Sequence, residues 1–396
     1  MKRLAVSILS LVLVGGCFER IELESIGFEE LLVVESIITD VEETQIVKLR
    51  KTSPIGQDTI IGVLDVEMLV RSSEGDIYDF METEETGVYQ SLEPFAGIVG
   101  SEYQLQFTTG TGQEYQSSWV EMLSTPAIEN LEAEFEPVSG DPNNANAGNF
   151  NFFISSGPTN KEETFMRWRW TSTYEIKIPQ PSRFLWLGGN DFIAREIGGD
   201  NEEFQVEICW PSQESKALLI EESQQVSGAF TRFPVHSFYS ETRWMLRGYH
   251  LFVEQYALSE ESFEFWDLLK RSNQEGGGLF DLQVGSISGN VKNVNDENEP
   301  VLGIFEAAQL RSIRRQYHPL DFREAGYLRN GQNFVDCADV DPLESETEEI
   351  GEFMEEFGDR YEIGFFVTGG GVFYIRKDCS NCTFYGTNLK PDYWVD

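Results

Sequence analysis

Apolar and polar residues alternate with a period of two along much of the chain from residue 28 onward. In TQIVKLRKT, Val47 and Leu49 fall on one face of an extended strand. Lys48 and Arg50 fall on the opposite face, so this strand is predicted to cover a core with one side. The stretch VEMLVRSSEGDIYDF predicts a hairpin with its turn at 73–76. Roughly seven such strands within about 100 residues predict an immunoglobulin-like or transthyretin-like β-sandwich.

The same alternation continues in the second part of the chain. In FMRWRWTSTYEIKI, the apolar residues Met166, Trp168 and Trp170 lie on one face, and Arg167 and Arg169 lie on the other. The stretch RYEIGFFVTGGGVFYIRKD predicts a late hairpin that turns through its glycines. The overall fold class is therefore mainly β, with a larger β-rich region following the first sandwich.

Two segments carry a helical pattern instead. SEESFEFWDLLKRSNQ starts with Ser259 as a plausible N-cap, and the glycines at 276–278 are expected to end it. SETEEIGEFMEEFG offers a capping box formed by Ser345 and Glu348 and a glycine stop at Gly358. Its apolar residues recur with the spacing of one helix face; they are Ile350, Phe353, Met354 and Phe357.

The N-terminus has a different pattern, with a basic start followed by the apolar run LAVSILSLVLV. This run is shorter than the roughly 20 apolar residues that span a bilayer, and it is typical of a secretory signal peptide. Val14-Gly15-Gly16-Cys17 resembles a bacterial lipobox, which implies cleavage before Cys17 and lipidation of its sulfur. The simpler alternative is an ordinary secreted protein in which a cysteine follows the signal peptide by chance.

These patterns divide the chain into four expected parts. Residues 1–16 are the predicted signal peptide, and 17–27 form a lipid-anchored tether. Residues 28–125 form the N-terminal β-sandwich domain, and Thr125-Pro126 opens a connection to the C-terminal β-rich domain at 126–396.

The charge of the chain excludes one class of partner. The chain has 29 Lys and Arg against 68 Asp and Glu, a formal net charge of −39. Nucleic-acid binding draws most of its affinity from neutralising phosphates, so we expect no nucleic-acid partner. Such a charge also favours solubility in high salt, although it identifies no ligand.

The four remaining cysteines, Cys209, Cys337, Cys379 and Cys382, include a C-x-x-C pair in CSNC. A four-cysteine zinc site, a redox motif and structural disulfides are the alternatives. An exported protein favours disulfides, and we expect Cys379–Cys382 together with Cys209–Cys337. The C-x-x-C bridge would close a small loop and mainly shape a local turn.

Catalytic motifs are missing from the sequence. The three histidines are dispersed, and no G-x-S-x-G, Walker loop or HExxH occurs. We therefore expect no enzyme activity, no cofactor and no catalytic or metal-binding residue. The acidic stretches DCADVDPLESETEE and NVNDENEP offer oxygen ligands without the spacing of a calcium loop, so calcium binding stays open.

Two features are candidate contacts for a partner. A basic cluster suits an anionic ligand or an acidic partner, although pairing with the chain's own carboxylates is the simpler expectation. Its members are Arg311, Arg314, Arg315 and His318. Trp186, in FLWLGGND, is a candidate loop-tip residue for sugar stacking or partner contact. Core packing is the ordinary interpretation for Trp168 and Trp170.

Longer stretches resemble a known family. FWDLLKRSNQEGGGLFDLQVGSISGNVKNVNDENEPVLGIF and CSNCTFYGTNLKPDYW are similar to a Bacteroidota outer-membrane lipoprotein family, catalogued as domain of unknown function forty-two forty-nine. LLVVESIITD and GVYQSLEPFAGIVGSEYQLQF resemble the opening β-domain of that family. Its members are often encoded beside TonB-dependent transporters, and the resemblance implies an accessory lipoprotein without catalytic residues.

The expected function is therefore a non-enzymatic, lipid-anchored accessory or ligand-binding component of a TonB-dependent transporter complex in the outer membrane. The membrane contact would be the lipid at Cys17, on the cell surface or the periplasmic face. The alternatives are a structural subunit of an envelope export complex and, less favoured, a surface glycan hydrolase. The 68 acidic residues leave the last possibility open, because sequence does not give carboxylate separations.

Overall fold

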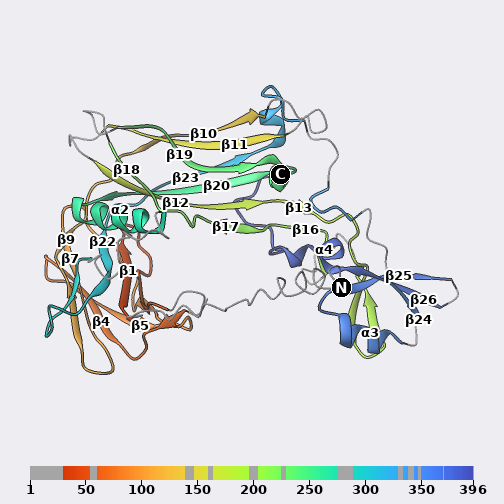
Figure 1. Cartoon of the computed structure of the whole chain (residues 1–396), viewed down its shortest axis with the longest axis horizontal. Helices are drawn as coiled ribbons and strands as arrows, with labels where there is room; N and C mark the ends of the chain where they lie inside the picture. Colours follow the sequence, from red (N-terminus) through yellow and green to blue (C-terminus); the bar gives the residue numbers. More distant parts are fainter. Residues whose placement is uncertain are drawn as a thin grey trace, which may run out of the picture.

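The computed structural model describes most of the chain from residue 30 onward. The described residues are 30–53, 60–138, 147–158, 164–195, 204–223, 229–274, 289–328, 333–337, 343–346, 349–368 and 370–395. Within them the chain is mainly β, as the alternating pattern predicts. Figure 1 shows a first sheet at one end of the long axis, two layers of long strands beside it, and a small unit with α3 at the other end.

The first sheet has eleven strands in the order β21-β8-β7-β4-β5-β6-β2-β1-β22, with β3 beside β2 and β9 beside β7. Alternate residues such as Val34, Leu49 and Leu105 fill one enclosed core. Its strands are β1 (Leu32–Ile38), β2 (Ile46–Lys51), β3 (Ile61–Gly62), β4 (Glu67–Ser72), β5 (Ile77–Glu82), β6 (Val88–Ser91), β7 (Glu102–Thr108), β8 (Glu114–Ser117), β9 (Val120–Glu121), β21 (Val291–Asn293) and β22 (Val301–Ala307).

Two of these strands come from the expected C-terminal domain. β22 pairs in parallel with β1, from Leu32 with Val301 to Ile38 with Ala307, and β21 pairs with β8. A cut at 125/126 therefore separates strands of one sheet. Hydrophobic alternation marks strands but does not specify which distant strand each one pairs with.

The central sandwich has two facing layers of long strands (Figure 1). One layer consists of β10 (Ile128–Pro137), β11 (Gly148–Ser156) and β19 (Phe230–Tyr239). The other consists of β12 (Phe165–Tyr174), β17 (Ser212–Glu214), β18 (Leu219–Glu222), β20 (Tyr249–Leu258) and β23 (Arg311–Tyr317). Trp168 and Trp170 point into the core between the layers, which confirms the predicted faces of β12.

Helix α2 (Glu260–Gln274) lies where the first sheet meets the central sandwich. The Ser259 hydroxyl accepts a hydrogen bond from the Ser262 N–H at 3.1 Å, which confirms the predicted N-cap. Trp266 packs with Leu302 and Ile304 of β22 in a core shared with the sandwich. The glycines at 276–278 lie outside the described residues.

The C-terminal unit is a small three-stranded sheet covered by a hairpin and a helix. Its elements are β14 (Phe184–Gly188), β15 (Asp191–Ala194), β24 (Leu343–Glu346), α3 (Ile350–Phe357), β25 (Tyr361–Val367) and β26 (Gly371–Arg376). Shorter elements complete the described chain: β13 (Ile176–Lys177), β16 (Ile208–Cys209), η3 (Ser240–Thr242), η5 (Pro319–Phe322), α4 (Lys377–Ser380) and η7 (Cys382–Phe384). The predicted late hairpin is confirmed as β25 and β26.

The predicted start of α3 is wrong. Ser345 lies in β24, opposite Val372 of β26, so it cannot cap a helix that begins at Ile350. The capping-box pattern is local, whereas pairing with β26 draws the chain into a strand. The predicted apolar face of α3 is confirmed, since Ile350, Phe353 and Met354 pack into the core of the C-terminal unit.

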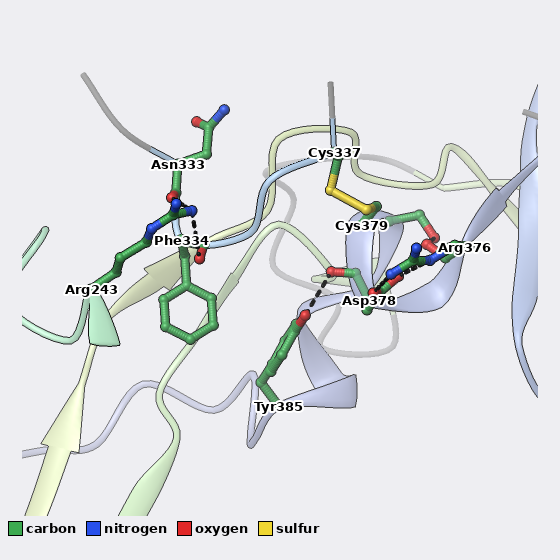
Figure 2. Close-up of a disulfide and its surroundings, with 9 residues drawn as sticks. Arg243, Asn333, Phe334, Cys337, Arg376, Asp378, Cys379 and Tyr385 are labelled. Atoms are coloured by element: carbon green, nitrogen blue, oxygen red, sulfur yellow. Dashed lines mark hydrogen bonds and ion pairs between the residues drawn. A yellow bond between two sulfur atoms is a disulfide. The ribbon is translucent and has the colours of Figure 1, made fainter. Parts of the chain in front are cut away.

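The expected disulfide pairing is also wrong, although all four cysteines are bonded. Cys209 pairs with Cys382, and Cys337 pairs with Cys379. Figure 2 shows the second bridge beside α4, near the hydrogen bond from the Tyr385 hydroxyl to the Asp378 carbonyl. An extended residue at 381 separates the two C-x-x-C cysteines, so each meets a different distant segment. The bridges therefore connect segments 173 and 42 residues apart rather than closing a local turn.

Among the described helices, none combines the length and the apolar content that crossing a bilayer would require.

Candidate functional site

A groove runs along the boundary between the first sheet and the central sandwich. It consists of two adjoining hollows of about 270 and 350 Å³. Four charged residues line both hollows and make them one site: Glu35, Lys48, Arg169 and Glu254. We call this site the junction groove.

Two strand ladders position these side chains. Glu35 of β1 and Lys48 of β2 are cross-strand partners, and alternation that buries Val34 and Leu49 turns both outward. Arg169 of β12 and Glu254 of β20 are partners on the outer face of the sandwich. The groove thus forms where the polar face of one ladder meets the polar face of the other.

Ion pairs cross the junction between the two bodies. Arg169 Nη2 lies 2.7 Å from Glu35 Oε1, and Arg167 Nη2 lies 3.7 Å from the same oxygen. Burial alone would raise the pKa of Glu35, but the charges of Arg169 and Arg167, together with those of two further cations, Lys48 and Arg50, hold this pKa below its usual value. Glu35 therefore stays ionised at neutral pH.

A buried clasp lies beneath the groove. Arg167 Nη1 is 3.0 Å from Glu306 Oε2, and the indole N–H of Trp266 donates to Glu306 Oε1 at 3.0 Å. The Arg167 guanidinium also stacks 3.9 Å above the Trp266 ring. Both charged partners are almost fully buried, so removing either one would leave an unpaired charge at a cost of about 3–5 kcal/mol. The clasp fixes the first sheet, α2 and the sandwich in one arrangement.

Groups of both signs remain available in the groove. Within the described residues, Lys48 and Lys216 take part in no ion pair. Burial raises the pKa of Glu254, although a hydrogen bond with Tyr256 and the charge of Arg169 oppose this rise. A small polar ligand would find ammonium donors at the two lysines and a carboxyl partner at Glu254.

A larger hollow of about 700 Å³ lies along the connection between the two bodies. Residues 123–127 and the start of α2 form much of its wall, with Leu258 and Phe165 among its apolar side chains. Among the described residues, no lysine or arginine lines this hollow, whereas four line the junction groove. The convergence of charged residues from two bodies makes the smaller groove the better candidate site.

The comparison with protein families now identifies the family. The model of the Domain of unknown function (DUF4249) matches residues 19–314, about three quarters of the chain. The chain belongs to the DUF4249 family. The match includes the first sheet, the central sandwich up to the middle of β23, and all the described residues that line the junction groove. CSNCTFYGTNLKPDYW lies beyond the match, so this stretch is not among the residues that show the family.

No curated protein sequence matches this DUF4249 chain. Among solved structures, trypsin-activated alpha-2-macroglobulin from Escherichia coli is 9% identical, with 59% of this chain and 15% of that chain covered and a TM-score of 0.18. Two fibronectin type III domains of chicken tenascin are 9% identical, with 58% and 92% covered and a TM-score of 0.16. A DUF4785 family protein from Legionella pneumophila is 8% identical, with 57% and 51% covered and a TM-score of 0.17. The chain thus spans about a seventh of the first of these proteins, and such low scores carry no functional argument.

The predicted basic cluster lies on β23, an edge strand of the sandwich. The expectation that Arg311, Arg314 and Arg315 pair with carboxylates is wrong within the described residues. Arg311 donates to Gln309 Oε1 at 2.9 Å, and Arg315 donates to the Leu131 carbonyl at 2.8 Å. Arg314 stacks on aromatic rings.

Trp186 does not stand at a loop tip. It lies within β14 and packs, partly buried, against the core of the C-terminal unit. Its indole N–H donates to the Gly189 carbonyl at 2.7 Å, which holds the ring against its own hairpin. Leu187 is the more exposed side chain at this end, with 58% of its surface accessible.

The remaining predicted residues that the structure describes give no second site. Cys17 lies outside the described residues, as does part of DCADVDPLESETEE. In NVNDENEP, Glu299 accepts a hydrogen bond from the Tyr115 hydroxyl at 2.7 Å and another from the Asn293 amide. Across the described ranges no group of three His, Cys, Asp or Glu side chains has a metal-binding arrangement.

Sequence patterns identified the groove residues only in part. Alternation placed Lys48 on the polar face of its strand and Arg167 and Arg169 opposite the tryptophans. It did not show that these two polar faces meet, because that contact depends on the return of β22 to the first sheet. The sequence signal that could have indicated the groove was the presence of lysine and arginine on the polar faces of predicted strands in a strongly acidic chain.

Proposed function

We propose that this protein is a lipid-anchored, non-enzymatic binding protein that serves as an accessory to a TonB-dependent transporter of the outer membrane. The observation that carries the binding role is the junction groove, where Lys48 and Glu254 stand available between two rigidly joined bodies. The signal-peptide pattern and the lipobox at Cys17 support anchoring. The transporter link rests on the resemblance to a family often encoded beside such transporters.

The groove suits a small polar ligand for physical reasons. Its volume is near that of a small-molecule site, and charged side chains of both signs line it. The clasp of Arg167 with Glu306 keeps the walls in place, so little ordering accompanies binding. An accessory protein of this kind would present the ligand to its transporter without changing it chemically.

The binding role is tested by what the protein retains. We expect the tagged full-length protein, purified from native membranes, to release a small polar molecule that mass spectrometry detects. Ala217→Trp, at the exposed wall of the groove, is expected to abolish this retention by filling the space. Ala194→Trp, on exposed β15 away from the groove, is the matched control and should retain the molecule. Equal retention by both variants, or none by the wild type, would reject the groove as a binding site.

The accessory role is tested by what accompanies the protein. We expect a TonB-dependent transporter to co-purify with the protein in mild detergent at a stoichiometric ratio. The Cys17→Ala variant should be lost from the membrane fraction and should no longer co-purify the transporter. An export or assembly machine in its place would favour the structural role. The absence of any membrane partner would contradict both roles.

A further inference from the structure

Arg314 lies on the outer face of the central sandwich, beyond the junction groove. It belongs to β23, and its cross-strand partner on β20 is Phe252. The next residue on this face of β20, Glu254, belongs to the groove. β23 is the end strand of this layer in the order β17-β12-β20-β23, and Figure 1 shows it beside β20.

Aromatic rings hold the Arg314 guanidinium in place. Its central carbon is 4.4 Å from the Phe252 ring centroid and 4.7 Å from that of Tyr393. The Tyr393 hydroxyl lies 2.9 Å from Thr173 Oγ1, and its ring is 4.3 Å from that of His250. The guanidinium is thus oriented before any partner arrives, which lowers the entropy cost of binding.

The N–H donors of this guanidinium have no acceptor within the described residues. Its side chain is exposed, and the described contacts of Arg314 are the two rings. Two more exposed arginines, Arg311 and Arg315, lie on the same edge strand, where alternation turns them toward the opposite face of β23 from Arg314. Within the described residues, each donates its hydrogen bond to a neutral oxygen, at Gln309 or Leu131. We call Arg311, Arg314 and Arg315 the arginine strip.

An arginine strip without carboxylates is unexpected here. The chain has 68 acidic residues against 29 basic ones, so an exposed arginine has many possible partners of its own. Charged residues on an edge strand commonly prevent edge-to-edge pairing. That role does not require a guanidinium stacked between two rings on the face of the sheet. Stacked arginines instead present their N–H edge to planar anions such as carboxylates.

We propose that the arginine strip docks an acidic segment of a partner protein, with Arg314 as the central contact. Charge complementarity identifies the occupant, since no carboxylate among the described residues pairs with this strip on a chain of net charge −39. Val395 is 68% exposed and follows Tyr393 in the C-terminal tail, so apolar side chains beside the carboxylates would also find a contact. This inference rests on the proposed function, because the partner would be the membrane complex that the protein serves.

Site-specific photo-crosslinking tests the strip in native membranes. Ser312 is exposed next to Arg314, so a benzoylphenylalanine placed there reaches a docked segment without removing an arginine. The expected product is a protein crosslink whose peptide contains at least two Asp or Glu. Arg314→Gln in the full chain should lower its yield at least about tenfold, because a charge-assisted contact is lost. Arg314→Lys keeps the charge but loses the planar fork, and should give an intermediate yield.

Arg71→Gln is the matched control, since Arg71 is an exposed arginine of the first sheet. It should leave the crosslink unchanged, and the yield should fall with added salt for the wild type. An unchanged thermal midpoint for Arg314→Gln shows that the fold is intact. A thermal midpoint that falls far enough to leave the variant unfolded at the crosslinking temperature would instead explain the lost yield and overturn the inference.

Three further outcomes would overturn it: no crosslink, a crosslinked peptide without acidic residues, or a crosslink to lipid or lipopolysaccharide. If a TonB-dependent transporter co-purifies but any of these results appears, the proposed function stands and the strip fails. If an acidic segment crosslinks but belongs to another kind of protein, the strip stands and the transporter role fails.

Discussion

His236 shows how a single residue couples the core of the sandwich to pH. Its Nε2 lies 2.7 Å from the Tyr249 hydroxyl oxygen, and its ring centroid is 3.9 Å from that of Trp170. Burial lowers the pKa of His236 to about 4. The neutral imidazole is therefore part of the folded structure, and protonation opposes folding.

The folded protein thus binds this proton less readily than the unfolded chain, whose histidine pKa is about 6.5. Between about pH 6.5 and 4 the unfolded state binds more protons, so stability falls as pH falls. We expect His236 to remove up to about 3 kcal/mol of unfolding free energy across this window. Urea denaturation at several pH values measures the slope.

His236→Gln should flatten that slope, whatever its effect on stability at neutral pH. His250 keeps its own contribution in the variant, because burial, assisted by the charge of Arg314, lowers its pKa to about 4 as well. The difference between the two slopes therefore isolates His236. Equal slopes would show that the imidazole protonates in the folded state.

At the same scale, residue type was easier to predict than residue pairing. The sequence indicated that Cys209, Cys337, Cys379 and Cys382 form disulfides, and they do. Their connectivity was wrong because proximity in sequence favoured the C-x-x-C bridge. The long loops that the observed bridges close restrict the unfolded chain more strongly, by roughly 4–5 kcal/mol each in the chain-entropy account.

At the scale of elements, periodic patterns predicted strands and helices well where the pattern depends on local burial. Local burial patterns predicted four of the observed features: the strand β2, the hairpin of β4 and β5, the late hairpin of β25 and β26, and helix α2. β24 did not, because its strand conformation comes from pairing with β26 rather than from its own sequence. The parallel pairing of β22 with β1 has no local signature either.

Gly303 makes this parallel pairing possible. It lies opposite Val34 in the ladder with a φ of +154°, and a Cβ there would lie 2.2 Å from the Val34 carbonyl oxygen. Gly303→Ala is expected to lower the free energy of unfolding by at least about 2 kcal/mol, because the β1–β22 ladder must open to admit the methyl group. Chemical denaturation monitored by tryptophan fluorescence measures the change.

Gly110→Ala is the control for a glycine without that constraint. Its Cβ would meet Asp65 at 3.2 Å on the surface, so we expect a loss below about 1 kcal/mol. Similar losses for both variants would mean that the close approach of β22 to β1 does not limit the fold.

At the scale of the whole molecule, the predicted fold class was confirmed, but the prediction missed how distant strands are connected into one sheet. The sequence predicted a mainly β chain with a first sandwich and a larger β-rich region. It did not reveal that 289–309 returns to the first sheet, nor that this return creates the junction groove. Glu306 of β22 contributes the buried carboxylate of the clasp, so the groove depends on a contact between distant segments.

This return predicts that the first sheet does not fold from its own segment. A fragment of residues 30–125 lacks β21 and β22, which leaves the edge of β1 unpaired and removes Phe305 from the core. We expect it to unfold without a cooperative transition. The same fragment joined through a flexible linker to 289–309 regains both strands and should unfold cooperatively in urea. The parallel bridge of Leu123 with Ala308 shows that the two segments end side by side. A cooperative transition in the short fragment would instead make the first sheet an independent domain, and would reduce β22 to a strand that docks on it.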